Sequence, residues 1–265
     1  MRNSGIAGCR GLALASLLAG TMMMCGAAEA GGLYLRAGVG LDRPGGTAFT
    51  DRDCSSASPA ALYGCGRGGD GAPLRSVGDF AAAPTLELGL GYAASSALRL
   101  EVVAEYRPRL DFEGRANFLE PRRRQSVEVE LSSLTAMLAA YLDLAEAGLP
   151  GLGPLAPFVG AGAGVVSTRA GATRMTFPRT TTLVPGARRS GFAWMFEAGV
   201  SAALGGRATL DLAWRYTDLG EVRTGRGAGQ VIWRDASREP LPLDLAETWS
   251  RLTCHGLRLS IRYAF

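Results

Sequence analysis

The side chains that could do chemistry in this chain are one histidine, five cysteines and charged residues that alternate with apolar ones. Lipases and proteases that pair a nucleophile or an acid with a histidine could use only His255 here, because it is the sole histidine. It shares the apolar parity of its segment, which favours a non-catalytic interfacial position. A metal centre would need several His or Cys ligands. The GAGAG stretch at 160–164 lacks the third spaced glycine and the following helix of a phosphate loop. We therefore expect a non-enzyme with no cofactor and no metal.

The first 30 residues are typical of a secretory signal. Arg2 and Arg10 precede an apolar stretch at 11–27, and Ala28-Glu29-Ala30 has the small-x-small pattern of a cleavage site. The stretch is shorter than the roughly 20 apolar residues of a spanning helix, and no later stretch approaches that length. A lipidated Cys25 is the alternative, but the three methionines before it do not form a lipobox. We expect a cleaved signal at 1–30 and one domain at 31–265.

Export bears on the cysteines, because an oxidising compartment favours disulfides. Cys54 and Cys65 lie close together in a Gly/Ser-rich segment, so they are expected to pair. Cys254 is then left over and is expected to be a small buried residue. The net charge of +4 falls to about +3 without the signal, which is too mild to indicate nucleic-acid binding.

Apolar and polar residues alternate along eight segments of the mature chain, which predicts β-strands rather than helices. The clearest is ALRLEVVAEYR at 97–107, where every charge falls on one parity. The eight segments are 32–41, 84–93, 97–107, 125–144, 156–166, 191–204, 209–218 and 255–265. Within 125–144 the apolar set changes parity, which predicts a bulge near Ser132-Ser133.

The connections alternate in length. Long, polar, Arg-, Gly- and Pro-rich stretches occupy 42–83, 108–124, 167–189 and 218–250, whereas 93–97, 145–154 and 205–207 are shorter. Strands of about 9 to 11 residues joined in this way predict an all-β fold, an eight-stranded antiparallel up-and-down transmembrane β-barrel. The short turns and both termini would face the periplasm and the long loops the cell exterior.

A soluble barrel with its apolar face inside would show the same alternation. Two features favour the membrane barrel. The polar faces are dominated by Gly, Ala and Ser with interspersed ions, which suits a crowded interior better than a water-facing surface. Aromatic residues also gather near the strand ends of the apolar set, as interface girdles require; these are Tyr92, Tyr106, Trp194, Tyr263 and Phe265.

Charged residues on the polar parity would then point into a narrow lumen, where they must pair or be neutralised. The predicted lumen ions are Arg36, Glu87, Arg99, Glu101, Glu105, Arg107, Glu197, Asp211, Arg215, Arg258 and Arg262. We expect Glu197 and Arg215 to pair across neighbouring strands with Arg258 adjacent, forming a plug. The alternative is a set of ordinary solvated lumen residues.

Several short motifs resemble the small outer-membrane barrels related to opacity proteins and to the barrel domain of outer-membrane protein A. They are PFVGAGAGV at 157–165, GFAW and AGVS within 191–201, LAWRYTDLG at 212–220 and the closing RYAF. The resemblance covers the mature chain from about residue 32 and implies an eight-stranded barrel. It also implies that the outer-membrane assembly machinery reads the C-terminal aromatic, here Phe265 with Tyr263. The family often has an acidic residue after the histidine, where this chain has Gly256.

The predicted loops are where partners would bind. The arginine clusters Arg122-Arg123-Arg124 and Arg188-Arg189 are expected at the outer rim, where guanidinium groups could bind lipopolysaccharide phosphates in bidentate fashion. A merely solvated basic loop is the alternative. Two functions remain open: a structural surface protein that stabilises the outer membrane, and an adhesion module that binds a host or cell-surface ligand. A small diffusion pore is a third, weaker option.

Overall fold

The computed structural model describes residues 32–149 and 153–265, so the expected signal at 1–30 lies outside the described residues. All regular structure in the described ranges is β, in fourteen strands. No helix there is long and apolar enough to cross a membrane. The strands form one sheet with continuous antiparallel pairing.

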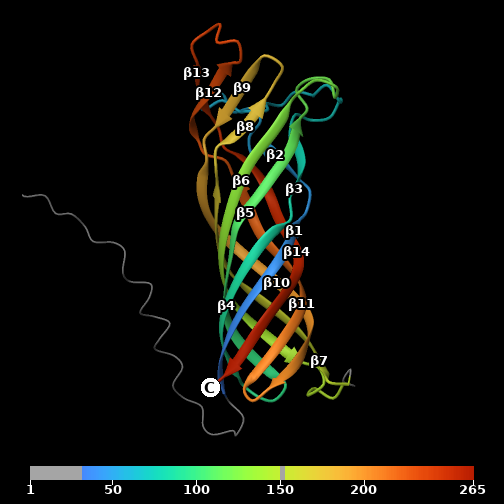
Figure 1. Ribbon diagram of the computed structural model, residues 1–265. Helices are drawn as coiled ribbons and strands as arrows, with labels where there is room; N and C mark the ends of the chain where they lie inside the picture. Colours follow the sequence, from blue (N-terminus) through green and yellow to red (C-terminus); the bar gives the residue numbers. More distant parts are fainter. Residues whose placement is uncertain (1–31, 150–152) are drawn as a thin grey trace, which may run out of the picture. The chain divides into compact units, whose positions relative to one another are not determined.

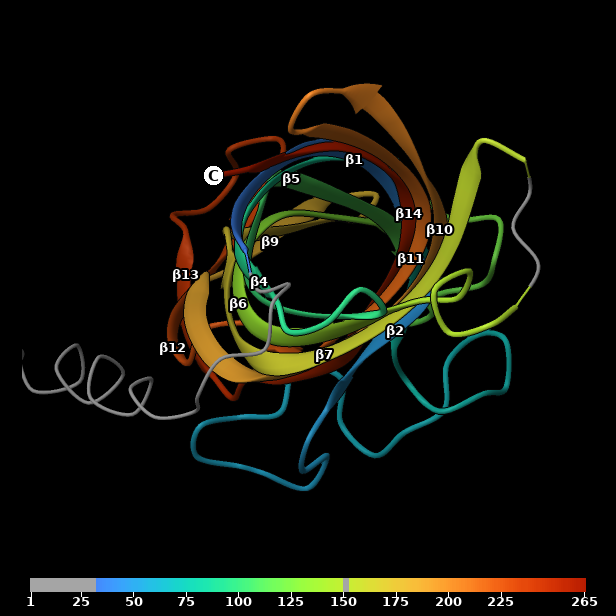
Figure 2. The same ribbon diagram turned by 90° about the horizontal axis from the view of Figure 1, so that it is seen from below.

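Eight long strands close into a ring. They are β1 (Leu33–Pro44), β4 (Ala83–Ala93), β5 (Leu98–Ala116), β6 (Ser126–Asp143), β7 (Leu155–Ala170), β10 (Ala187–Gly205), β11 (Ala208–Arg223) and β14 (Thr248–Ala264). Each pairs antiparallel with its neighbours in chain order. The pairing of β1 with β14 closes the ring, as the view along its axis shows (Figure 2). The prediction of an eight-stranded up-and-down barrel is confirmed.

The exterior of the ring is apolar over the part nearer the short turns. Leu88, Leu138 and Leu212 are 61%, 63% and 51% exposed, although a water-soluble fold would bury most residues of this kind. The polar residues between them point inward and are buried, as period-two alternation requires. We call this part, with a polar interior and an apolar exterior, the lower tier.

The ring strands are longer than predicted. Both β5 and β10 have 19 residues, against the expected 9 to 11 or so. Above the lower tier the wall continues with reversed chemistry, an apolar interior and a polar exterior, and we call this part the upper tier. The reversal explains why the prediction undercounted: the strands continue, but their apolar side is now the inner one.

Strand β6 shows the reversal directly. Its odd-numbered residues point inward along the whole strand, from Val127 in the upper tier to Tyr141 in the lower tier, without a change of phase. The predicted bulge at Ser132-Ser133 is therefore wrong. The apolar set changes parity because the interior changes from apolar to polar. A register shift does occur nearby, but on the partner strand β5, between Arg107 and Leu110.

The segments predicted as loops contain six further strands. They are β2 (Thr47–Asp51), β3 (Ser76–Phe80), β8 (Thr173–Thr176), β9 (Thr180–Val184), β12 (Gly227–Trp233) and β13 (Leu241–Leu245). β2 and β3 continue the wall between β14 and β5 beyond the ends of β1 and β4. β8 pairs with β6, and β9 leads through β12 to the edge strand β13 (Figure 1). The interpretation of 42–83, 167–189 and 218–250 as loops alone is wrong.

The upper tier has a hydrophobic core of its own. The ring of Phe112 lies edge-on to Phe49 and Phe80, with centroids 5.1 and 5.2 Å apart. Leu110 and Leu131 are buried beside them in the same cluster. Aromatic pairs in this geometry stabilise a fold beyond the area they bury. A packed apolar layer thus lies above the polar interior of the lower tier.

Candidate functional site

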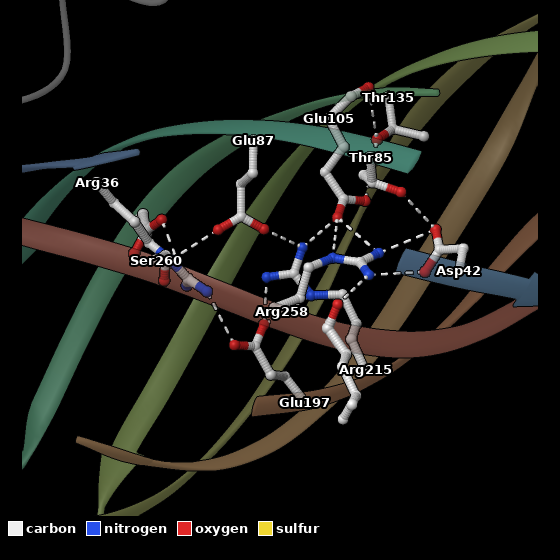
Figure 3. A network of polar contacts seen from close by, with 12 residues as sticks. Arg36, Asp42, Thr85, Glu87, Glu105, Thr135, Glu197, Arg215, Arg258 and Ser260 are labelled. Carbon is white, nitrogen blue, oxygen red and sulfur yellow. Dashed lines mark hydrogen bonds and ion pairs between the residues drawn. The ribbon is translucent and has the colours of Figure 1, made fainter. Parts of the chain in front are cut away.

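The inward-facing ions of the lower tier form one connected group, which we call the lumen cluster. It consists of Arg36, Asp42, Glu87, Glu101, Glu105, Arg107, Glu197, Arg215 and Arg258, from β1, β4, β5, β10, β11 and β14. Figure 3 labels all of them except Glu101 and Arg107. None of these residues is more than 3% exposed. Charges so buried are tolerated only when paired and hydrogen-bonded.

Arg215 lies at the centre of the cluster. Its guanidinium contacts Glu197 on the neighbouring strand β10 and Glu87 on β4. It also donates to Glu105 on β5. In the closed ring, β5 and β11 lie four strands apart in either direction, so the contact between Arg215 and Glu105 spans the full width of the lumen. The predicted Glu197–Arg215 neighbours are thus in contact, within a larger network.

Arg36 on β1 contacts side chains from four other strands of the ring. Its Nε lies 2.7 Å from Glu87 Oε1 and donates to Ser260 Oγ at 3.0 Å. Its terminal nitrogens donate to Glu197 Oε1 at 2.9 Å and to the Tyr141 hydroxyl at 3.0 Å. These groups come from β4, β14, β10 and β6. A single guanidinium therefore joins five strands of the ring.

Asp42 belongs to the cluster but was assigned to the first loop from the sequence. Its carboxylate accepts from Arg107 Nε at 2.7 Å, from Arg258 Nη1 at 2.7 Å and from the Thr85 hydroxyl at 2.9 Å. Asp42 is in phase with Arg36 on the inward side of β1, so the alternation, extended by one residue, would have found it. It lies directly across from Gly256. The carboxylate that the resemblance leads one to expect after His255 is supplied here by the neighbouring strand.

The cluster contains four guanidinium groups and five carboxyl groups. Glu101 has the weakest ion pairing of the five: within the described part of the chain its only guanidinium contact is Arg36 Nη1 at 3.8 Å. Its Oε2 accepts from the Tyr34 hydroxyl at 2.9 Å, and its Oε1 has no hydrogen-bond partner. Glu101 is therefore the carboxyl group whose charge the cluster compensates least.

Glycines opposite the large ions make room for them. Across neighbouring strands Arg258 faces Gly40, Arg36 faces Gly89 and Glu101 faces Gly91. A Cβ atom on Gly40 would lie 2.7 Å from both Cδ and Nη1 of Arg258, closer than real carbon contacts come. The glycine-rich polar faces in the sequence thus have a steric cause in close packing.

Three predicted lumen ions lie outside the cluster. Arg99 makes a bidentate pair with Asp143, at 2.9 and 3.0 Å, and stacks between the Tyr141 and Phe158 rings. Arg262 pairs with Asp211 at 2.6 Å. Asp143, like Asp42, was not singled out from the sequence, although it lies on the inward parity of β6. These two pairs lie closer to the short turns than the lumen cluster does.

The other singled-out residues are placed as follows. Cys54 and Cys65 form a disulfide in the segment between β2 and β3. Cys254 is free and buried. His255 is exposed on the outside of β14, between Arg43 on β1 and Tyr216 on β11. No group of three or more potential ligands in the described ranges is arranged to hold a metal ion.

The arginine clusters and the terminal aromatics lie at opposite ends of the barrel. Arg122, Arg123 and Arg124 are exposed in the turn between β5 and β6, and Arg188 and Arg189 are exposed on β10. Arg189 is engaged by Glu247 at 2.5 Å. At the other end, the rings of Tyr263 and Phe265 are 50% and 67% exposed and pack edge-on.

The fold and the pattern of its two faces agree with the comparison to known families. The family model described as "Outer membrane protein beta-barrel domain" matches residues 12–234. The chain belongs to this family. As an outer membrane β-barrel it is a protein of the bacterial outer membrane, and the resemblance noted from the sequence is confirmed. No curated protein matches the chain.

Solved structures of outer membrane proteins resemble this outer membrane β-barrel at low sequence identity. Neisserial surface protein A is 14% identical, with a TM-score of 0.43, over 89% of this chain and 100% of that one. OprG from Pseudomonas aeruginosa is 13% identical, with a TM-score of 0.39, over 87% and 97%. The outer membrane protease OmpT from Escherichia coli is 7% identical, with a TM-score of 0.47, over 88% and 97%.

Proposed function

We propose that the protein is a closed, non-enzymatic structural element of the outer membrane. The observation that carries the proposal is the contact between Arg215 and Glu105 across the whole lumen, with both side chains 0% exposed. Ions and solutes cross a barrel only along a hydrated path. Fully buried, mutually paired charges leave no such path at the level of the cluster.

The upper tier supports the same reading. The aromatic layer around Phe112 closes the barrel a second time, above the lumen cluster. A solute entering from that end would have to displace packed apolar side chains as well as break buried ion pairs. The diffusion-pore alternative therefore has less support than the structural one.

We place the short turns and both ends of the barrel domain in the periplasm and the upper tier outside the cell. The exported chain, its expected signal at 1–30 and the exposed Tyr263 and Phe265 at the end of β14 support this orientation. Those two aromatics are available to the assembly machinery. A non-enzymatic role is supported by His255, whose cross-strand neighbours are Arg43 and Tyr216 rather than a nucleophile.

A deletion strain tests the structural role. We expect it to become more sensitive to detergents, because a closed barrel seals the bilayer it occupies. Complementation with the full chain should restore resistance, and so should a variant that lacks the β12–β13 hairpin, since the barrel remains. Unchanged detergent sensitivity in the deletion strain would contradict the proposal.

A recognition role is the second candidate, favoured by the architecture of the upper tier. The segment between β2 and β3 is fixed by the Cys54–Cys65 disulfide and by Asp51, whose carboxylate accepts from the backbone N–H groups of Leu62, Tyr63 and Gly64. A surface ordered in this way binds without a large entropic cost of ordering. Adhesion that is lost when the disulfide-bonded segment between β2 and β3 is shortened, with detergent resistance retained, would favour this role.

A further inference from the structure

Two exposed arginines face each other on the outside of the barrel. Arg169 on β7 and Arg188 on β10 are directly opposite in the register of these neighbouring strands. Directly opposed like charges destabilise a sheet unless something lies between them. Repulsion between the two guanidinium groups therefore destabilises the protein when nothing is bound. An anion bound between Arg169 and Arg188 would remove this repulsion.

Carboxylates neutralise other arginines of this outer surface but not this pair. Arg109 lies 2.8 Å from Asp111, and Arg251 contacts Asp218. The nearest acidic residue on β6 is Glu130, two residues from Ser132, the partner of Arg169; its carboxylate lies 4.0 Å from Arg109. Within the described ranges no carboxylate comes within ion-pair distance of Arg169 or Arg188. The charges of Arg169 and Arg188 are thus not neutralised by a carboxylate of the described residues.

Between the apolar exterior and the arginine pair, the outward residues of β7 and β10 change from apolar to hydroxyl-bearing. Val165 and Phe192, 62% and 66% exposed, are opposite each other at the upper part of the apolar exterior. Ser167 and Ser190 come next, and Arg169 and Arg188 follow. Ser132 on β6 stands beside Arg169 in the same row. The row therefore presents two guanidinium groups and several hydroxyls directly above a surface suited to acyl chains.

The height of the pair matches the headgroup layer. Four residues along a strand tilted about 40° rise about 10 Å along the membrane normal. The headgroup layer extends about 5–8 Å beyond the hydrocarbon core on each side. Arginine side chains are long enough to reach into that layer from a Cα position just above it.

We propose that Arg169 and Arg188 form a binding site for the phosphate of a membrane lipid, whose acyl chains lie along Val165 and Phe192. Guanidinium groups bind phosphate in bidentate fashion, and the hydroxyls of Ser167 and Ser190 can donate to its remaining oxygens. The site rests on the placement of the apolar exterior in the outer membrane. Of the arginines that the sequence predicted to contact lipid, the site includes only Arg188. Its partner Arg169 was not singled out from the sequence.

Native mass spectrometry of the folded protein in detergent tests the site. The probe is bisphosphorylated lipid A, and the comparison lipid is the same molecule without its phosphates. We expect Arg169→Gln/Arg188→Gln to bind the bisphosphorylated lipid about tenfold more weakly or worse, the effect of losing charge-assisted hydrogen bonds. The dephosphorylated lipid should bind weakly to every variant. Arg169→Lys/Arg188→Lys keeps the charges but not the planar fork and should fall in between.

The matched control is Arg115→Gln/Arg174→Gln, which removes the same charge from exposed positions higher on the upper tier. It should bind as the unmodified protein does. Equal loss in the control, or no loss in the test variant, would overturn the site. Inorganic phosphate at the lipid's concentration should not compete, and competition would show that free phosphate rather than lipid is recognised. Insertion of each variant into vesicles, measured separately, shows whether the membrane placement itself holds.

Discussion

Replacing Arg215 with methionine tests whether the lumen cluster is dry. The substitution keeps the length of the side chain roughly constant but removes the guanidinium that contacts Glu87, Glu105 and Glu197. Removing one partner of a buried ion pair typically costs about 3–5 kcal/mol, because the partner charge stays buried. Glu87 and Glu197 each keep a contact with Arg36, and Glu105 keeps contacts with Arg107 and Arg258. We therefore expect a loss within that range rather than three separate penalties.

The assay is urea unfolding of the protein in lipid vesicles, followed by tryptophan fluorescence. Arg109→Met is the control, because Arg109 pairs with Asp111 at 2.8 Å on the outside of the barrel and its side chain is 64% exposed. We expect the control to lose far less stability than Arg215→Met, because solvent-exposed pairs contribute little. The double variant Arg215→Met/Glu197→Gln removes one charge of each sign and should lose less than Arg215→Met alone. A loss for Arg215→Met no larger than that of the control would refute a dry cluster.

Three further predictions follow from the same geometry. Gly40→Val places atoms against Arg258 and should destabilise the barrel by about 1–3 kcal/mol in the same unfolding assay, whereas Gly191→Val should do so less, because Gly191 is exposed on β10 and an added Cβ there would meet only Val166 Cγ1 at 3.9 Å. Glu101→Gln removes the carboxyl group whose charge is compensated least, so it should lower the free energy of unfolding less than Glu197→Gln does. A larger loss for Glu101→Gln would contradict the count of five carboxyl groups against four guanidinium groups. Partial burial opposes ionisation of Glu247, but the hydrogen bond and charge of Arg189, with Arg223, hold its pKa below the ordinary value. Its ionised form therefore stabilises the upper tier at neutral pH, and this contribution disappears as pH falls below about 4. The protection of the Thr248 amide, which donates to Thr224, is measured by hydrogen exchange relative to the intrinsic exchange rate at each pH; it should then fall with acid in the unmodified protein but not in Glu247→Gln.

The lower tier could be predicted because every ring strand there has a polar inner face and an apolar outer face. Period-two alternation located each ring strand, and the inward parity contained Glu197, Arg215 and Arg258. The same rule extended by one residue would have included Asp42 on β1. What alternation could not give is which ions meet. The contact of Arg215 with Glu105 depends on the stagger of strands four apart, and no local pattern encodes that stagger.

The upper tier was missed because the sequence rule assumed one interior chemistry along a whole strand. In β6, Val127 and Val129 face an apolar interior while Tyr141 faces the polar one, so a continuous strand looks like two segments out of phase. The short strands β8 and β9 have only four and five residues, too few for alternation to be distinguished from a polar loop. Their pairing with β6 and β12 comes from tertiary contacts.

Conductance across a planar bilayer tests the central claim most directly. Paired, fully buried charges across the lumen, with an apolar layer above them, predict that the inserted protein carries no steady current at moderate voltage. Insertion is verified in the same preparation by protection of the lower tier from protease. Steady openings in the nanosiemens range from verified, correctly folded protein would contradict the account, because they require a continuous column of water where the cluster lies.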